Sequence, residues 1–91
     1  MVTDEEMARL RWRCRRGLLE LDLVFEQFIR HQYPSLGPEL KDEFWLLLDE
    51  ADNAILAWLN GSESCTDSGL NKIIKKIRED IDYQHKKIKE T

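Results

Sequence analysis

Hydrophobic side chains recur every three or four residues along most of this chain, which is the spacing of one face of an α-helix. Glycine, proline and short polar runs interrupt the pattern and divide it into five helical segments. We therefore predict an all-α fold, a compact five-helix bundle formed as a single domain by residues 1–91. The highly charged last residues, 84–91, can fray.

The first two segments carry clear end signals. Thr3, followed three residues later by Glu6, has the form of a capping box, so the first helix should begin there. Gly17 should end it, because glycine readily adopts the left-handed conformation just past a helix. The second helix should start directly at Leu18 and end at Tyr33-Pro34. Its apolar stripe comprises Leu18, Leu21, Phe25, Phe28 and Ile29, with Val24 at the edge.

The third and fourth segments are shorter. Pro38 suits the first position of the third helix, and Asp52 or Asn53 can cap the fourth, which should stop at Asn60-Gly61. The stripe of the third helix comprises Leu40, Phe44, Leu47 and Leu48, with Trp45 at its edge.

A polar loop over residues 61–69 precedes the fifth helix, which Asp67 or Ser68 should cap. This helix is amphipathic, with lysines on the side that should face solvent. Its apolar stripe comprises Leu70, Ile73, Ile74, Ile77, Ile81 and Ile88.

Composition limits the class of protein. The chain is 42% hydrophobic and 35% charged, which is typical of a soluble globular protein, and its net charge of −4 argues against a dedicated nucleic-acid binder. It has neither a signal-peptide pattern nor an apolar run long enough to span a membrane, so we expect a cytoplasmic protein without membrane insertion. Cys14 and Cys65 should be reduced thiols.

The sequence offers no recognisable catalytic group. His31 and His85 are isolated, the four glycines are scattered, and the acidic residues after Glu39 lack the spacing of a calcium loop. We expect a protein that is not an enzyme, with no catalytic residue, no metal site and no stably bound cofactor.

The unusual stretch is Arg9 to Asp22, where five arginines crowd ahead of Gly17. Helical spacing places Arg9, Arg13 and Arg16 on one face, and Trp12 lies off the apolar stripe among the arginines. A solvated basic helix end is one interpretation, since cations stabilise the C-terminus of a helix. A protein-docking surface is the other, because Trp and Arg are enriched at interfaces.

The same stretch resembles the FAD assembly factors of succinate dehydrogenase, also called flavinylation factors. Their signature Arg-Gly-x-x-Glu stands here as Arg16-Gly17-Leu18-Leu19-Glu20, and the match extends to Arg9-x-x-Trp12-x-Cys14-Arg15 before it and to Leu21-Asp22 after it. Glu43-Phe44, Leu47-Leu48, Asp52 and Trp58-Leu59 also follow the family pattern. Asn53-Ala54 departs from it, which affects only the cap of the fourth helix.

The resemblance implies a small bacterial helical protein that binds the flavoprotein subunit of succinate dehydrogenase, and often of fumarate reductase, as a monomer or weak dimer. It would promote covalent attachment of FAD to a histidine of that subunit, and the FAD would stay on the client. Gly17 would allow close approach of the client, Arg16 and Glu20 would form charge-assisted hydrogen bonds with it, and Trp12 would be a desolvated anchor. The complete set of expected partner-binding residues is Arg9, Trp12, Arg15, Arg16, Gly17, Glu20 and Asp22.

Two other functions are weighed against this one. A small nucleic-acid-binding or regulatory module could use the Arg9–Arg16 basic face on phosphates, although the acidic total weakens this interpretation. A carrier of free FAD would need a phosphate-binding loop, which the sequence does not contain.

Overall fold

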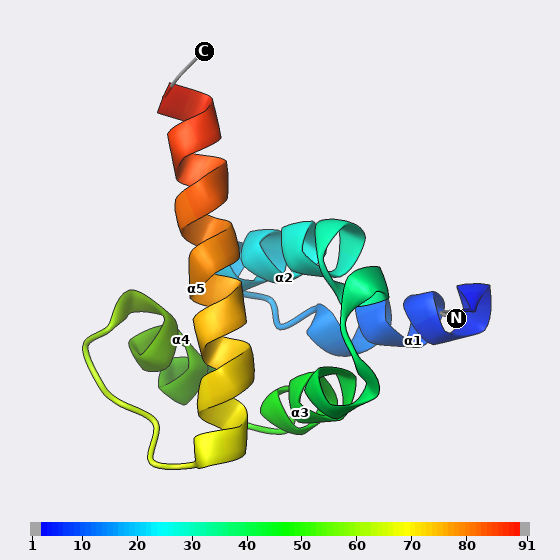
Figure 1. Ribbon diagram of the computed structural model, residues 1–91, viewed down its shortest axis with the longest axis horizontal. Helices are drawn as coiled ribbons and strands as arrows, with labels where there is room; N and C mark the ends of the chain where they lie inside the picture. Colours follow the sequence, from blue (N-terminus) through cyan, green and yellow to red (C-terminus); the bar gives the residue numbers. More distant parts are fainter. Residues whose placement is uncertain (1–2, 90–91) are drawn as a thin grey trace.

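Helices make up most of the chain (Figure 1). The computed structural model describes residues 3–89, and for residues 84–89 only the backbone is described. The backbone of residues 84–89 belongs to α5, and the fraying of residues 84–91 stays a prediction. The predicted place of Ile88 in the apolar stripe concerns a side chain outside the described set. The elements within it are α1 (Asp4–Cys14), α2 (Leu19–His31), a short 3₁₀ helix (Tyr33–Ser35), α3 (Pro38–Leu47), α4 (Asp52–Asn60) and α5 (Ser68–Lys89).

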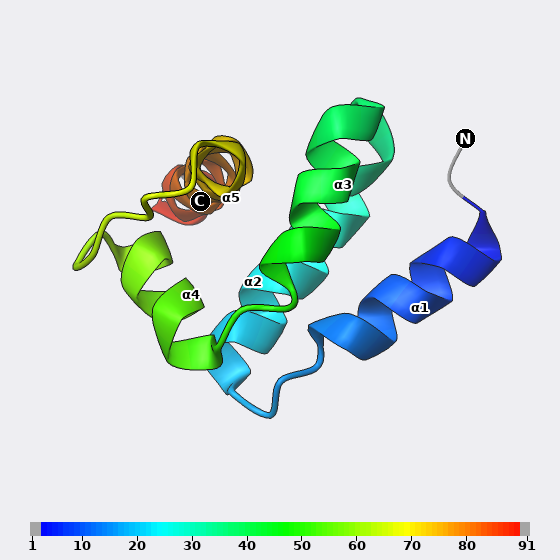
Figure 2. The ribbon, with the colours of Figure 1, turned by 90° about the horizontal axis from the view of Figure 1, so that it is seen from below.

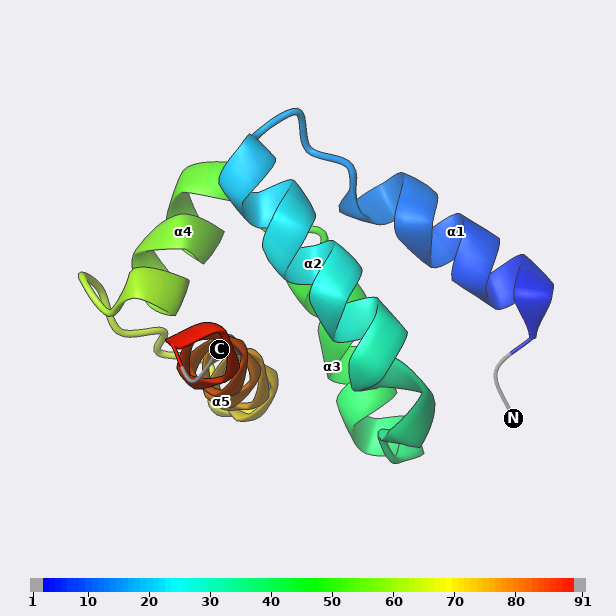
Figure 3. The ribbon, with the colours of Figure 1, turned by 90° about the horizontal axis from the view of Figure 1, so that it is seen from above.

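α2 and α3 form the centre of the molecule, with α1 on one side and α4 and α5 on the other (Figures 2 and 3). α1 packs mainly against α2, whereas α5 contacts α2, α3 and α4. The core is aromatic at the centre: the rings of Phe25, Phe28 and Tyr33 surround Phe44 with centroid distances of 5.8, 5.3 and 5.6 Å. This arrangement confirms the predicted all-α fold with five helices.

Four predicted helix signals are confirmed. The Thr3 hydroxyl accepts the backbone N–H three residues later at 3.1 Å and caps α1. Pro38 is the first residue of α3. Gly61 ends α4 with a φ of +82°, and the Asp67 carboxylate caps α5 by accepting a backbone N–H at 2.9 Å.

The predicted junction between the first two helices is wrong. α1 ends at Cys14, and the backbone of Arg15 is extended, so the chain leaves the helix before Gly17 is reached. Gly17 has the expected positive φ of +82°, but within a linker rather than directly after the helix. Leu18 precedes α2 and is partly exposed instead of buried in its stripe. Arg16 therefore does not share a helical face with Arg9 and Arg13.

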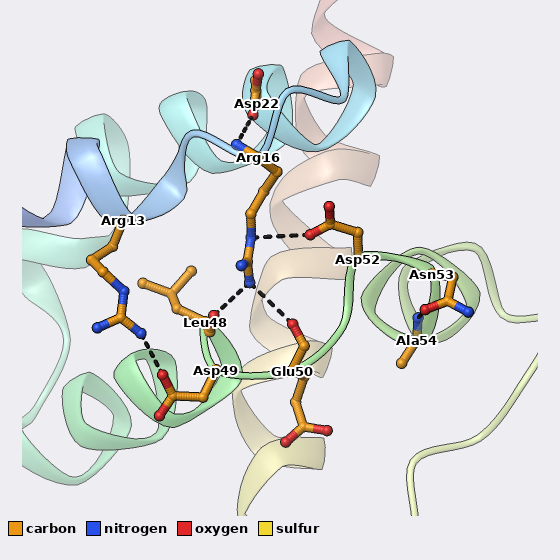
Figure 4. Close-up of polar contacts among 9 residues, drawn as sticks. All are labelled: Arg13, Arg16, Asp22, Leu48, Asp49, Glu50, Asp52, Asn53 and Ala54. Atoms are coloured by element: carbon orange, nitrogen blue, oxygen red, sulfur yellow. Dashed lines mark hydrogen bonds and ion pairs between the residues drawn. The ribbon is translucent and has the colours of Figure 1, made fainter.

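Two further boundaries differ from the predictions. α2 ends at His31, and Tyr33-Pro34 forms the separate 3₁₀ helix that carries the chain towards α3. α4 is preceded by Ala51, which makes no side-chain cap, and Asp52 is already the first helical residue. The side chain of Asn53 accepts only the N–H of the adjacent Ala54, at 3.0 Å (Figure 4). Asp52 is thereby left available for an ion pair with another part of the chain.

Tyr33 links three elements through hydrogen bonds. Its hydroxyl donates to the Glu6 carboxylate of α1 at 2.8 Å and accepts from the Trp45 indole of α3 at 3.0 Å. The Glu6 side chain therefore faces Tyr33. Burial and the hydrogen bond to Glu6 raise the pKa of Tyr33 to about 12, so the phenol remains protonated and able to donate at neutral pH.

The cysteines and the length of the helices also bear on the sequence predictions. Cys14 and Cys65 are buried, free thiols. None of the described helices combines the length and the apolar character that crossing a membrane requires.

Replacing Tyr33 with Phe should lower the free energy of unfolding by about 1–2 kcal/mol, because Trp45 and Glu6 lose their shared partner. The effect should depend on pH. The folded pKa of about 12 exceeds the ordinary value of 10.0, so this stabilisation is complete below about pH 10 and is lost as the pH rises towards 12. Urea unfolding at about pH 8 and about pH 11 measures both effects, and equal pH dependence in the two proteins would contradict the assignment.

Candidate functional site

The linker between α1 and α2 is held in place by Arg16, whose side chain points into the molecule (Figure 4). Its Nη2 donates to the backbone carbonyls of Leu48 at 2.6 Å and Glu50 at 3.3 Å. Both carbonyls belong to the linker between α3 and α4. Arg16 thus joins two linkers that are more than thirty residues apart in sequence.

The charge of Arg16 is compensated within the chain. Its Nε lies 3.3 Å from a carboxylate oxygen of Asp52, an ion-pair distance, although the N–H is not aligned with that oxygen as a hydrogen bond. The backbone N–H of Arg16 donates to the Asp22 carboxylate at 2.8 Å. Only 16% of the Arg16 side chain is exposed. In this structure Arg16 and Asp22 therefore use these groups to shape the linker, and their predicted contacts with a partner remain predictions.

A second arginine adds to the same connection. Arg13, in the last turn of α1, pairs with Asp49 in the α3–α4 linker, and its guanidinium lies 5.9 Å from the ring centroid of Trp45. This pair is more exposed than that of Arg16, so it contributes less. Together the two arginines fix the position of the end of α1 over the end of α3.

The outer surface of this junction carries Gly17 and Glu20. A Cβ added to Gly17 would have no neighbour within 4 Å, so the space above it is open. Glu20, in the first turn of α2, is exposed. Within the described part of the chain it is not among the groups that bind Arg16, so the internal Arg16–Glu20 pair considered from the sequence does not form.

The remaining predicted partner residues lie around this junction. Trp12 is 78% exposed, as expected from its place off the apolar stripe. It borders an open recess of about 970 Å³ between α1 and α3, together with Arg9 and Trp45. Arg9 pairs with Glu5 at 3.0 Å on the surface of α1, and Arg15 is exposed. The predicted residues therefore lie along α1, in the linker and in the first turn of α2, and two different recesses border some of them.

Sequence reasoning missed two leucines. Leu19 and Leu23 lie one turn apart on α2 and are 74% and 58% exposed. Both stand off the stripe that the helix buries, and this spacing was the available signal. An exposed apolar pair beside the junction is a candidate contact surface.

Cys14 lies beneath the arginines but is not set up as a nucleophile. Burial raises the pKa of its thiol to about 12, against the lowering effect of Arg16 nearby. A thiol with this pKa is protonated at neutral pH and unreactive. Cys14 therefore gives the junction no reactive thiol.

A family model, curated relatives and a solved structure all match most of this chain. A family model described as "Flavinator of succinate dehydrogenase" matches residues 8–81. The FAD assembly factor SdhE of Vibrio cholerae is 40% identical over 77 residues, covering 85% of this chain and 90% of the relative. The protein of the same name from Shewanella oneidensis is 42% identical over 72 residues, covering 79% and 88%. The solution structure of a UPF0350 protein matches with a TM-score of 0.77 at 36% identity, covering 98% of this chain and 92% of that one.

The structural role of Arg16 can be separated from that of its neighbour. Arg16→Gln should lower the free energy of unfolding by about 2–3 kcal/mol, because charge-assisted hydrogen bonds to two backbone carbonyls are lost and Asp52 loses its partner. Arg15→Gln is the matched control and should change it by no more than about 0.5 kcal/mol, since that side chain is exposed. Urea denaturation of both variants checks this, and equal effects would refute the internal role of Arg16.

Proposed function

Because this chain belongs to the family of succinate dehydrogenase flavinators, we propose that it binds the flavoprotein subunit of succinate dehydrogenase and promotes the covalent attachment of FAD to it. The related flavoprotein of fumarate reductase is a further proposed client. The relatives from Vibrio cholerae and Shewanella oneidensis are named FAD assembly factors, and we assign the same role to this protein, acting in the bacterial cytoplasm.

The observation that carries the proposal is the shape of the α1–α2 linker. Arg16 anchors the linker from inside, while Gly17 and Glu20 face outwards over open space. A binding surface that is already ordered loses less conformational entropy when a partner binds. The same three residues make up the Arg-Gly-x-x-Glu signature, so the signature divides into one internal anchor and two outward contacts.

Binding alone can account for an effect on flavin attachment. Joining the flavin methyl group to a histidine requires both groups to be held in a near-attack geometry, with developing charge stabilised nearby. We propose that the client supplies the reacting groups and the FAD, and that this protein holds the client in the reactive arrangement. The proposal requires no nucleophile here, and the protonated thiol of Cys14 agrees with that.

The nucleic-acid alternative draws less support from the geometry. Arg9, Arg13 and Arg16 pair with Glu5, Asp49 and Asp52, respectively. Phosphate binding would need these arginines to give up their partners, and the remaining basic side chains of the junction are few. The geometry therefore favours a protein partner.

Substitutions at Gly17 test the proposal. Gly17→Ala and Gly17→Arg share the cost of a left-handed backbone conformation, about 1–2 kcal/mol, and neither side chain meets a neighbour within the chain near its Cβ. Both variants should therefore fold with similar stability. The Arg side chain should block close approach of the client, so only Gly17→Arg should abolish client binding and reduce covalent flavin by about tenfold or more.

The readout is in-gel flavin fluorescence of an apo flavoprotein subunit co-expressed with each variant, beside a co-purification assay. Thermal unfolding of the two variants serves as the control for folding. Covalent flavin at the wild-type level in the absence of this protein would remove the proposed function. Full activity of Gly17→Arg would instead place the docking surface elsewhere on the chain.

A further inference from the structure

Leu19 and Leu23 form an apolar patch that the fold leaves uncovered. They are 74% and 58% exposed, at positions i and i+4 of α2, so they lie next to each other on one helix face. Leu18, at 39% exposed, lies just before them in the linker. The linker residue before α2 and the first two turns of α2 thus present leucine to solvent.

A recess lies next to this patch, between α1 and α2, which run side by side (Figure 3). Its volume is about 420 Å³, and its lining residues are Arg11, Cys14, Arg15, Asp22, Leu23 and Glu26. Cys14 is almost fully buried and its thiol is neutral at physiological pH. The recess therefore combines an uncharged group at its base with a charged rim.

The charges on that rim are unequally compensated. On the α2 side, Glu26 pairs with Arg30 at 3.0 Å, and the Asp22 carboxylate accepts the backbone N–H of Arg16. These two carboxylates formally balance the two guanidiniums on the α1 side of the rim. Arg11 and Arg15 are nevertheless its exposed charged members, and their side chains make no hydrogen bond or ion pair with a described residue.

We propose that Leu19, Leu23, Arg11 and Arg15 form a second contact surface for the flavoprotein client, which receives a segment with apolar side chains flanked by carboxylates. This inference rests on the proposed function. The surface is continuous with Gly17 and Glu20, so one client could cover both. The leucines contribute apolar burial, and the two arginines pair with the carboxylates and set the orientation of the segment.

A double substitution, Leu19→Ser with Leu23→Ser, tests the apolar half. Affinity is measured by titrating the purified protein into apo flavoprotein subunit and following the bound fraction. We expect binding about tenfold weaker or more, since two leucines would lose their contact with the client. Leu46→Ser is the matched control, because Leu46 is 54% exposed on α3, outside the proposed surface, and it should change affinity by less than about twofold.

The double variant Arg11→Glu with Arg15→Glu tests the charged half of the surface. Its control is Lys75→Glu with Lys76→Glu, which changes the charge equally on the exposed side of α5. The first pair should weaken binding strongly and reduce its dependence on salt, because the cations that pair with the client's carboxylates are gone. The lysine pair should have a much smaller effect.

The outcomes separate this inference from the proposed function. If Gly17→Arg abolishes client binding while the leucine and arginine variants bind like their controls, this second surface is refuted and the proposed function stands. If the wild-type protein does not bind the flavoprotein at all, both are overturned. If the leucine variant changes only the oligomeric state of the protein, measured by sedimentation, the patch joins two copies of this chain and the assignment to the client is wrong.

Discussion

The position of the α1–α2 linker depends on the guanidinium of Arg16. α1 packs mainly against α2, and α4 packs against α5 on the opposite side of the molecule. Arg16 spans the region between them by donating to two carbonyls of the α3–α4 linker and by pairing with Asp52 at the start of α4. Carbonyls just past a helix end lack partners within the helix, and here an arginine from another linker satisfies them.

Because Arg16 binds groups inside the molecule, the five arginines of the cluster do not all belong to one basic surface. Five cations lie within eight residues, yet they do not form one basic field. Arg13 and Arg16 connect α1 and its linker to the α3–α4 linker, and Arg9 pairs along its own helix. Arg11 and Arg15 are left towards solvent. The division explains how an acidic protein can carry such a cluster without being organised for phosphate binding.

The same division gives the family signature a physical basis. Its arginine determines where the linker lies, its glycine permits a positive φ and leaves the surface open, and its glutamate stands exposed on the first turn of α2. The three residues of the signature thus have three different structural environments. Arg16 acts inside the molecule, whereas Gly17 and Glu20 lie on its surface.

The sequence by itself determined the helices, since the spacing of leucine, isoleucine and phenylalanine and the end signals at Thr3, Pro38, Gly61 and Asp67 are local properties. It also carried the family resemblance. Only the tertiary structure decided that α1 stops at Cys14 and that Arg16 turns inwards. These outcomes depend on acceptors more than thirty residues away, at Leu48, Glu50 and Asp52. Helical periodicity relates only residues of the same helix. Applied to Arg16, it wrongly placed this residue on the same face as Arg9 and Arg13, because Arg16 lies in a linker whose direction those distant contacts set.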